Sequence, residues 1–165
     1  MLQSKLFSNE YWMKQALLLA QKAFESGEVP VGAVLVQDDQ VLAKGYNQVE
    51  CLKDPTAHAE ILAITSACHH LQNWRLDKAV LYVTKEPCLM CAGAILQAKI
   101  PTVVFGATDD KEGAAGSHYD VMREHRKIFV EVVPGVCQKE GESLLREFFK
   151  TVRREKNGGK ESKPA

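Results

Sequence analysis

One histidine and one cysteine pair constrain this 165-residue chain more than any other feature of its sequence. His58 and Glu60 form a His-x-Glu motif, and Pro87 precedes a Cys-x-x-Cys motif made by Cys88 and Cys91. One imidazole and two thiolates are a suitable ligand set for zinc. Three protein ligands leave a fourth tetrahedral position open for water, which is typical of catalytic zinc sites. The sequence therefore predicts one Zn²⁺ per subunit, bound by His58, Cys88 and Cys91.

Glu60 is the predicted proton carrier of such a site. A zinc-bound water has a pKa of about 7, so hydroxide is available at neutral pH. Attack on an amino-bearing ring carbon also needs a group that moves protons from the water to the leaving ammonia. One carboxylate can do both if it does not bind the metal. A helix that starts after Pro87 would also favour the thiolate forms of Cys88 and Cys91.

Three other readings of these motifs stay open. A thioredoxin-like redox pair would explain Cys88 and Cys91 but would leave His58 and Glu60 without a task. A His-x-Glu motif by itself is common on solvated helix faces. A non-catalytic zinc module would need a fourth protein ligand, and no remaining candidate has zinc-finger spacing. These candidates are Cys51, Cys68, His69, His70 and Cys137.

The composition, with 45% hydrophobic and 25% charged residues, is that of an ordinary globular protein. We expect a single domain over residues 1–156 and a disordered tail over residues 157–165, which are rich in Gly, Lys, Glu, Ser and Pro. Five cysteines without regular spacing argue against a disulfide framework. Because the sequence shows neither a secretory signal nor an apolar run of transmembrane length, the expected location is cytoplasmic.

Charge is distributed unevenly although the formal net charge is zero. Residues 146–165 hold seven basic and three acidic residues, a local net charge of +4. A basic end on a neutral chain is suited to a phosphate backbone. The alternative is a solvated helix that runs into a frayed tail.

Hydrophobic periodicity predicts strands that alternate with helices after an initial helix and hairpin. The predicted helices cover residues 9–26, 57–70, 88–99, 119–126 and 140–156, and the predicted strands cover residues 29–36, 41–46, 79–84, 102–107 and 129–133. This order implies parallel crossovers, with both metal-binding segments at helix N-termini. His58 and Glu60 are about 200° apart on a regular helix. They can act together only if His58 lies in an irregular first turn.

With these motifs in view, the chain resembles the bacterial tRNA-specific adenosine deaminases of the cytidine deaminase-like superfamily, over about residues 9–154. The resemblance rests on the segments 28–34, 54–60, 86–94, 104–107 and 113–117. It implies an α/β fold of three layers (α/β/α), with a mixed five-stranded sheet and helices on both faces. It also implies a homodimer. The chain departs from the family pattern at His118, Tyr119 and Glu124.

The same resemblance implies zinc-dependent hydrolytic deamination of adenosine to inosine at the wobble position of a tRNA anticodon. Glu60 would be the catalytic residue, and the anticodon stem-loop would be the partner. The substrate-binding residues that it implies are Val31, Asn47, Ala59, Glu86, Asp109, Phe149 and Arg153. A deaminase of free guanine or cytosine compounds would share the metal ligands and stays an alternative. RNA binding discriminates between the two.

Overall fold

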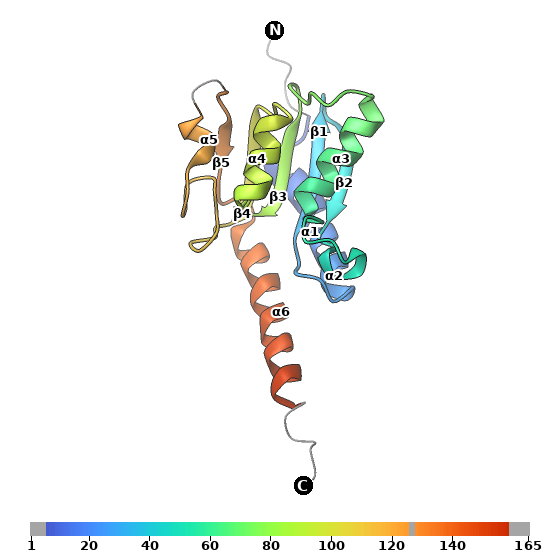
Figure 1. Cartoon of the computed structure of the whole chain (residues 1–165), viewed down its shortest axis with the longest axis vertical. Coiled ribbons are helices and arrows are strands. Elements are labelled where there is room, and N and C mark those ends of the chain that lie inside the picture. Colours follow the sequence, from blue (N-terminus) through green and yellow to red (C-terminus); the bar gives the residue numbers. More distant parts are fainter. Residues whose placement is uncertain (1–5, 126–127, 159–165) are drawn as a thin grey trace.

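A mixed five-stranded sheet forms the centre of the protein in the computed structural model, which describes residues 6–125 and 128–158 (Figure 1). The strands are β1 (Gly32–Gln37), β2 (Gln40–Tyr46), β3 (Val80–Lys85), β4 (Thr102–Ala107) and β5 (Glu131–Val133). The helices are α1 (Asn9–Glu25), α2 (Val49–Leu52), α3 (Ala59–Leu71), α4 (Leu89–Gln97), α5 (Val121–Glu124) and α6 (Gln138–Gly158).

The strand order is β2-β1-β3-β4-β5. β1 pairs antiparallel with both β2 and β3, whereas β3 pairs parallel with β4, and β4 with β5. β2 therefore runs parallel to β3 across β1. Each connection from β2 onward is then a crossover that contains a helix, as the alternation of elements predicted.

Helices cover both faces of the sheet. Alternate strand residues such as Leu35, Leu81 and Phe105 face α3 and α4, in the larger of two apolar clusters. Their neighbours, such as Val34 and Tyr82, pack with residues of α1 in the smaller cluster. α6 contacts α1, β3 and β4, and its far end extends well beyond the sheet (Figure 1). The predicted three-layer α/β/α architecture is confirmed.

Several elements begin or end at residues other than those predicted. β1 starts at Gly32 rather than residue 29, because Pro30 has no N–H to donate to a neighbouring strand. α5 and β5 are shorter than predicted, and Arg126, where the predicted helix ended, lies outside the described residues. α6 continues to Gly158, two residues into the predicted tail, and residues 159–165 of that tail lie outside the description. No helix among the described residues has the length and apolar character to span a membrane.

Gly45 lets α3 approach the sheet closely. A Cβ atom at this position would lie 2.3 Å from the Ala59 carbonyl oxygen and 2.8 Å from the Ala63 nitrogen. Only glycine leaves room for the helix backbone here. The first turn of α3, which follows His58, is thereby held directly against β2.

Candidate active site

The three predicted metal ligands come together at the N-termini of α3 and α4. His58 is the N-cap residue of α3, Cys88 is the N-cap residue of α4, and Cys91 lies in the first turn of α4. His58 Nδ1 is 3.7 Å from the Cys88 Sγ atom and 3.5 Å from the Cys91 Sγ atom. In a tetrahedral zinc site, neighbouring nitrogen and sulfur ligands lie about 3.6 Å apart, given the usual metal–ligand bond lengths. The spacing therefore fits a zinc ion.

The donor set has three members. Within residues 6–125 and 128–158, no fourth His, Cys, Asp or Glu joins the group. Three ligands fit an open, catalytic type of site rather than a closed structural one. A hydrogen bond from the Cys91 thiol lowers the pKa of Cys88 to about 3, and the same pairing raises the pKa of Cys91. The pairing thus favours the thiolate form of Cys88, the form that binds metals.

Glu60 lies in the first turn of α3, beside the donor set but outside it. Its side chain is 4% exposed. Burial raises the pKa of Glu60 above its ordinary value, because a charged carboxylate is poorly solvated there. A carboxyl group whose pKa is moved toward neutrality is suited to accept and return protons.

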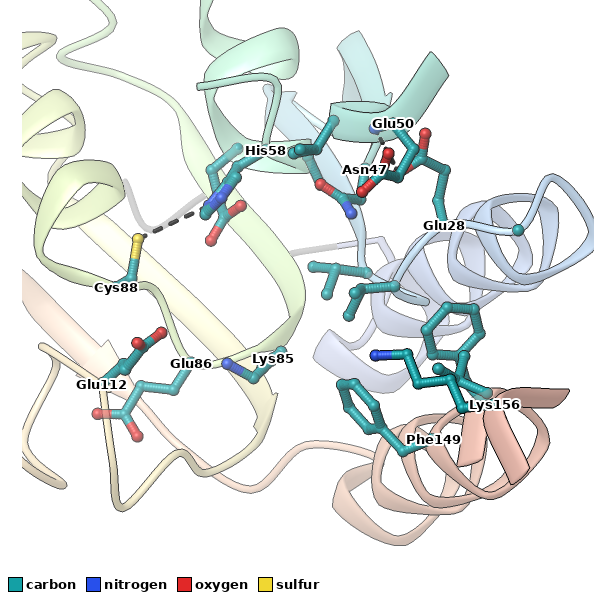
Figure 2. A pocket seen from close by; sticks show the side chains of 18 residues that line it. Glu28, Asn47, Glu50, His58, Lys85, Glu86, Cys88, Glu112, Phe149 and Lys156 are labelled. Carbon is teal, nitrogen blue, oxygen red and sulfur yellow. Dashed lines mark hydrogen bonds between the residues drawn. The ribbon is translucent and has the colours of Figure 1, made fainter. Parts of the chain in front are cut away.

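A cavity of about 630 Å³ opens in front of these residues (Figure 2). His58, Glu60 and Cys88 line it, together with five of the seven predicted substrate-binding residues. These five are Val31, Asn47, Ala59, Glu86 and Phe149. The other two predicted contacts, Asp109 and Arg153, do not line the cavity. Both lie beside residues that do, because Asp109 pairs with Lys85 and Arg153 follows Val152.

A short hydrogen-bonded loop presents His58. Asp54 Oδ1 accepts hydrogen bonds from the backbone N–H of Thr56 at 2.8 Å and from its hydroxyl at 2.7 Å. The His58 N–H then donates to the Thr56 carbonyl at 2.7 Å. Such Asx turns set the entry of a helix without help from the rest of the protein. The sequence signal of a turn before the helix was therefore sufficient.

Glu28 organises the wall that carries Asn47, and sequence reasoning missed it. Asn47 is 7% exposed, and its N–H donates to the Val31 carbonyl at 3.0 Å. Glu28 is 1% exposed, and its carboxylate accepts the N–H groups of Glu50 at 3.1 Å and Cys51 at 2.7 Å. It thus anchors the start of α2, just after Asn47. An acidic residue directly before an apolar run was the available signal.

Glu86 makes the most hydrogen bonds of any carboxylate in the cavity. Oε2 accepts the N–H of Asp109 at 3.0 Å, and Oε1 accepts the N–H groups of Ala115 and Ser117, each at 3.0 Å. Next to it, Lys85 pairs with the Asp109 carboxylate. Lys85 and Glu112 line the cavity but were not predicted. A lysine at the last position of a strand was a weak signal, since such residues are usually only solvated.

α6 forms the wall opposite the metal ligands. Figure 2 shows Phe149 and Lys156 reaching toward the cavity from α6, across from His58 and Cys88. Phe148 also lines the cavity and packs edge-on against Phe24 of α1, with ring centroids 5.7 Å apart. The basic residues of α6 are divided between its faces. Lysine and arginine side chains away from the cavity border a second, shallow hollow, at Arg146, Lys150 and Arg154.

The fold and the site together define a hydrolytic deaminase, with a His-Cys-Cys donor set and a buried carboxyl group at one end of an α/β sheet. The MafB19-like deaminase family model matches residues 7–153, so the chain belongs to this family. Within it, the chain belongs with the tRNA-specific adenosine deaminases. The one from Bacillus subtilis is 43% identical over 155 residues, which cover 93% of this chain and 96% of that protein.

Solved structures agree with this family. A structure from a study of A-to-I editing by tRNA:A34 deaminases at the wobble position of transfer RNA has a TM-score of 0.78 and 42% identity, and the match covers 82% of this chain and 99% of that one. The guanine deaminase from Nitrosomonas europaea has the same TM-score of 0.78 but only 25% identity, with 88% and 86% of the two chains covered. The fold is therefore common to both substrate classes, and the higher identity is to the tRNA deaminases.

Proposed function

We propose that this protein is a zinc-dependent tRNA adenosine deaminase, which hydrolyses adenosine to inosine at the wobble position of a tRNA anticodon. The observation that carries the proposal is the buried Glu60 carboxyl group beside three zinc-type ligands, in a cavity with one wall formed by α6. The sequence identity to tRNA-specific adenosine deaminases supports the choice of substrate.

His58, Cys88 and Cys91 would hold one zinc ion per subunit. The donor types and their separations fit this metal. When bound, zinc supplies the Lewis acidity that makes a water molecule a nucleophile at neutral pH.

Glu60 carries the protons of the reaction. Water adds to C6 of the adenine ring and ammonia leaves, so that one C–O bond forms and one C–N bond breaks. Glu60 takes the first proton from water and delivers it to N1 of the ring. It then carries the hydroxyl proton to the leaving amino group, and ends the cycle as the carboxylate with which it began. Burial favours this role, because it raises the pKa of the carboxyl group.

The residues around the cavity mouth would hold the flipped base. The Asn47 amide is suited to hydrogen-bond the edge of the base, and Val31 to pack against its face. Ala59 would contact the reacting end of the ring, since it lies between His58 and Glu60. Glu86 lines the same cavity, although its carboxylate already accepts three backbone N–H groups. A closed apolar and polar lining of this kind is typical of pockets for flipped nucleotides.

The anticodon loop would be held by residues farther from the metal site. Phe149 offers an exposed ring, 44% accessible, on which a flanking base can stack. Arg153 and the loop that begins at Asp109 would contact neighbouring nucleotides. A tRNA substrate also implies a cytoplasmic location, and we propose that the protein acts there as a homodimer. RNA binding by a neutral chain would depend on the local positive charge of α6.

A free-base deaminase is the second candidate, because the guanine deaminase fold is equally similar. The two functions are separated by a direct comparison of substrates. We expect purified protein to form inosine efficiently in an anticodon stem-loop and to turn over free adenosine poorly, since the free nucleoside supplies none of the flanking binding energy. Deamination of guanine, cytidine or adenosine as efficiently as the stem-loop would replace the proposed function with the second candidate.

A further inference from the structure

The carboxylate of Glu86 has little capacity left for a substrate. It is 2% exposed, and both of its oxygens accept backbone N–H groups, three in total. All three donors belong to one segment, residues 109–117, which we call the 109–117 loop. Glu86 comes from the end of β3, more than twenty residues earlier in the chain. A buried carboxylate that is bonded in this way ties the two segments together.

The fit between Glu86 and this loop is tight at Gly113. A Cβ atom on Gly113 would lie 2.5 Å from Glu86 Oε2 and 2.5 Å from the Asp109 carbonyl oxygen. Gly113 also forms a β-bridge with Cys88, and the Ala114 N–H donates to the Pro87 carbonyl at 2.8 Å. The loop is thus packed onto the turn that carries a metal ligand, with the Glu86 carboxylate at the centre of the contact.

The loop in turn shapes one wall of the cavity. Its first residue, Asp109, pairs with Lys85, and the side chains of Lys85 and Glu112 both line the cavity. In Figure 2, Lys85, Glu86 and Glu112 lie together on the side nearest Cys88. The bond from the Asp109 N–H to Glu86 Oε2 therefore fixes the residue that orients Lys85.

We propose that Glu86 is a positioning residue: its carboxylate holds the 109–117 loop against the Cys88 turn and so fixes the cavity wall made by Lys85 and Glu112. The effect on catalysis rests on the proposed function, because the wall matters there only if a nucleotide occupies the cavity. Glu86 acts on the substrate through the loop, whereas the sequence-based expectation was a direct contact.

The test uses three zinc-loaded variants of the full chain. Glu86→Gln replaces an acceptor oxygen with an NH₂ group that faces an N–H donor. Gly113→Ala leaves Glu86 intact and displaces the loop from the other side. The third variant carries both changes. The control is Glu131→Gln, which changes an exposed carboxylate of β5 that accepts a hydrogen bond from Thr102.

Amide hydrogen exchange and steady-state kinetics are measured on each variant. We expect Glu86→Gln and Gly113→Ala each to keep one zinc per chain and to speed exchange at Asp109, Ala115 and Ser117. Each should lower kcat/KM for the stem-loop about tenfold or more, as expected for loss of a hydrogen bond to a charged group. Because both act on one contact, the decrease in kcat/KM of the double variant should be no larger than that of the more impaired single variant. The Glu131→Gln control should have the zinc content, amide exchange and kcat/KM of the wild type.

Three results would overturn the proposal. Loss of activity in Glu86→Gln with unchanged amide exchange would assign Glu86 to direct substrate contact. Faster exchange with unchanged kcat/KM would remove the loop from the reaction. Loss of zinc in folded Gly113→Ala would make the contact a support for the metal ligand instead. If wild type fails to deaminate the stem-loop, the proposed function fails, while hydrogen exchange still tests whether Glu86 holds the loop.

Discussion

His58 and Glu60 line the same cavity although they are only two residues apart on the chain. His58 has an extended backbone at the N-cap position, with φ −73° and ψ 153°, whereas Glu60 already lies in the first turn of α3. The change of backbone conformation between them cancels the rotation of about 200° that separates such positions on a regular helix. The proposed metal ligand and the proposed proton carrier are thus placed on the same cavity by a single helix start.

Removal of the cysteine ligands should remove the metal. We expect Cys88→Ser/Cys91→Ser to hold almost no zinc by elemental analysis, because two of the three donors are removed. Cys51→Ser is the matched control, since Cys51 is an exposed cysteine outside the donor group. Chelation of wild-type zinc should abolish deamination, and added zinc should restore it. Full zinc content in the double variant would mean that the metal is bound elsewhere.

Glu60→Gln should separate metal binding from proton transfer. We expect one zinc per chain and a native fold, with kcat lowered by about 10²-fold or more, the usual contribution of a general acid–base group. Glu50→Gln changes another cavity carboxylate, whose side chain is 75% exposed, and should cost far less activity. Loss of zinc from Glu60→Gln, with activity recovered on addition of metal, would identify Glu60 as a ligand.

Asn47→Ala tests base recognition. The amide lines the cavity, and a pocket built to hydrogen-bond a base binds it much more weakly when that partner is removed. We expect kcat/KM to fall about tenfold or more at unchanged zinc content. The control is Asn73→Ala, an exposed asparagine whose side chain caps the Arg75 N–H at 3.0 Å. Normal kinetics with a lowered melting temperature would show that Asn47 only completes the loop after β2.

Charge reversal on α6 should act through salt-dependent RNA binding. Lys150 and Arg154 are one helical turn apart and border the same hollow. We expect Lys150→Glu/Arg154→Glu to raise KM for the stem-loop and to weaken its salt dependence, by about 0.7–0.9 in logarithmic slope for each phosphate that is no longer neutralised. Lys44→Glu/Lys78→Glu makes the same change of net charge on exposed residues elsewhere. Equal effects of the two pairs would trace the weaker binding to net charge alone.

Arg153 lies between the cavity face and the hollow face of α6, because it comes between the cavity residue Val152 and the hollow residue Arg154. We expect Arg153→Glu to weaken stem-loop binding more than Arg154→Glu does. Arg153 is next to a cavity residue, whereas Arg154 borders the hollow away from the cavity. The KM of each single variant for the stem-loop, measured at low salt, shows which face of α6 contacts the RNA. A larger effect at Arg154 would place the RNA backbone along the hollow instead.

The Lys85–Asp109 pair should stabilise the protein in a pH-dependent way. Burial alone would raise the pKa of Asp109, but the hydrogen bond from Lys85 and the backbone N–H donors outweigh it and lower the pKa. A lowered folded-state pKa contributes stability that is present above the unfolded value, about 3.9, and is lost as pH falls through the folded value. The stability gap between wild type and Asp109→Asn should therefore close below about pH 4. Urea titration measures it, with Asp77→Asn of the exposed Arg75 pair as control.

The sequence was sufficient for features that depend on neighbouring residues. The turn at Asp54 and Thr56 leads into α3, whose N-cap residue is His58, and the predicted zinc ligands follow from two short motifs. Strand and helix periods are also local, so the five strands and the crossovers were predicted with small errors at their ends. Asp38 and Asp39 adopt positive φ values of 51° and 56°, as a tight hairpin turn between β1 and β2 requires.

Local sequence patterns could not predict the interactions between distant segments. The Glu28 carboxylate accepts the N–H of Glu50, which is 22 residues away, and no residue near Glu28 in the sequence indicates that partner. Which face of α6 meets the cavity is set by how the helix packs on β4 and α1, which its own period cannot specify. Asp109 and Arg153 were placed by resemblance alone, and neither lines the cavity, although both lie beside residues that do.

The wall formed by α6 follows His58, Cys88 and Cys91 in the sequence, so it is synthesised after them. All three metal ligands and Glu60 have left the ribosome well before Phe148 and Phe149 follow. The proposed catalytic residues are thus all synthesised before the helix that forms the opposite wall of their cavity. A chain interrupted before α6 would contain the proposed metal ligands and Glu60, yet would lack the cavity wall that carries Phe148 and Phe149.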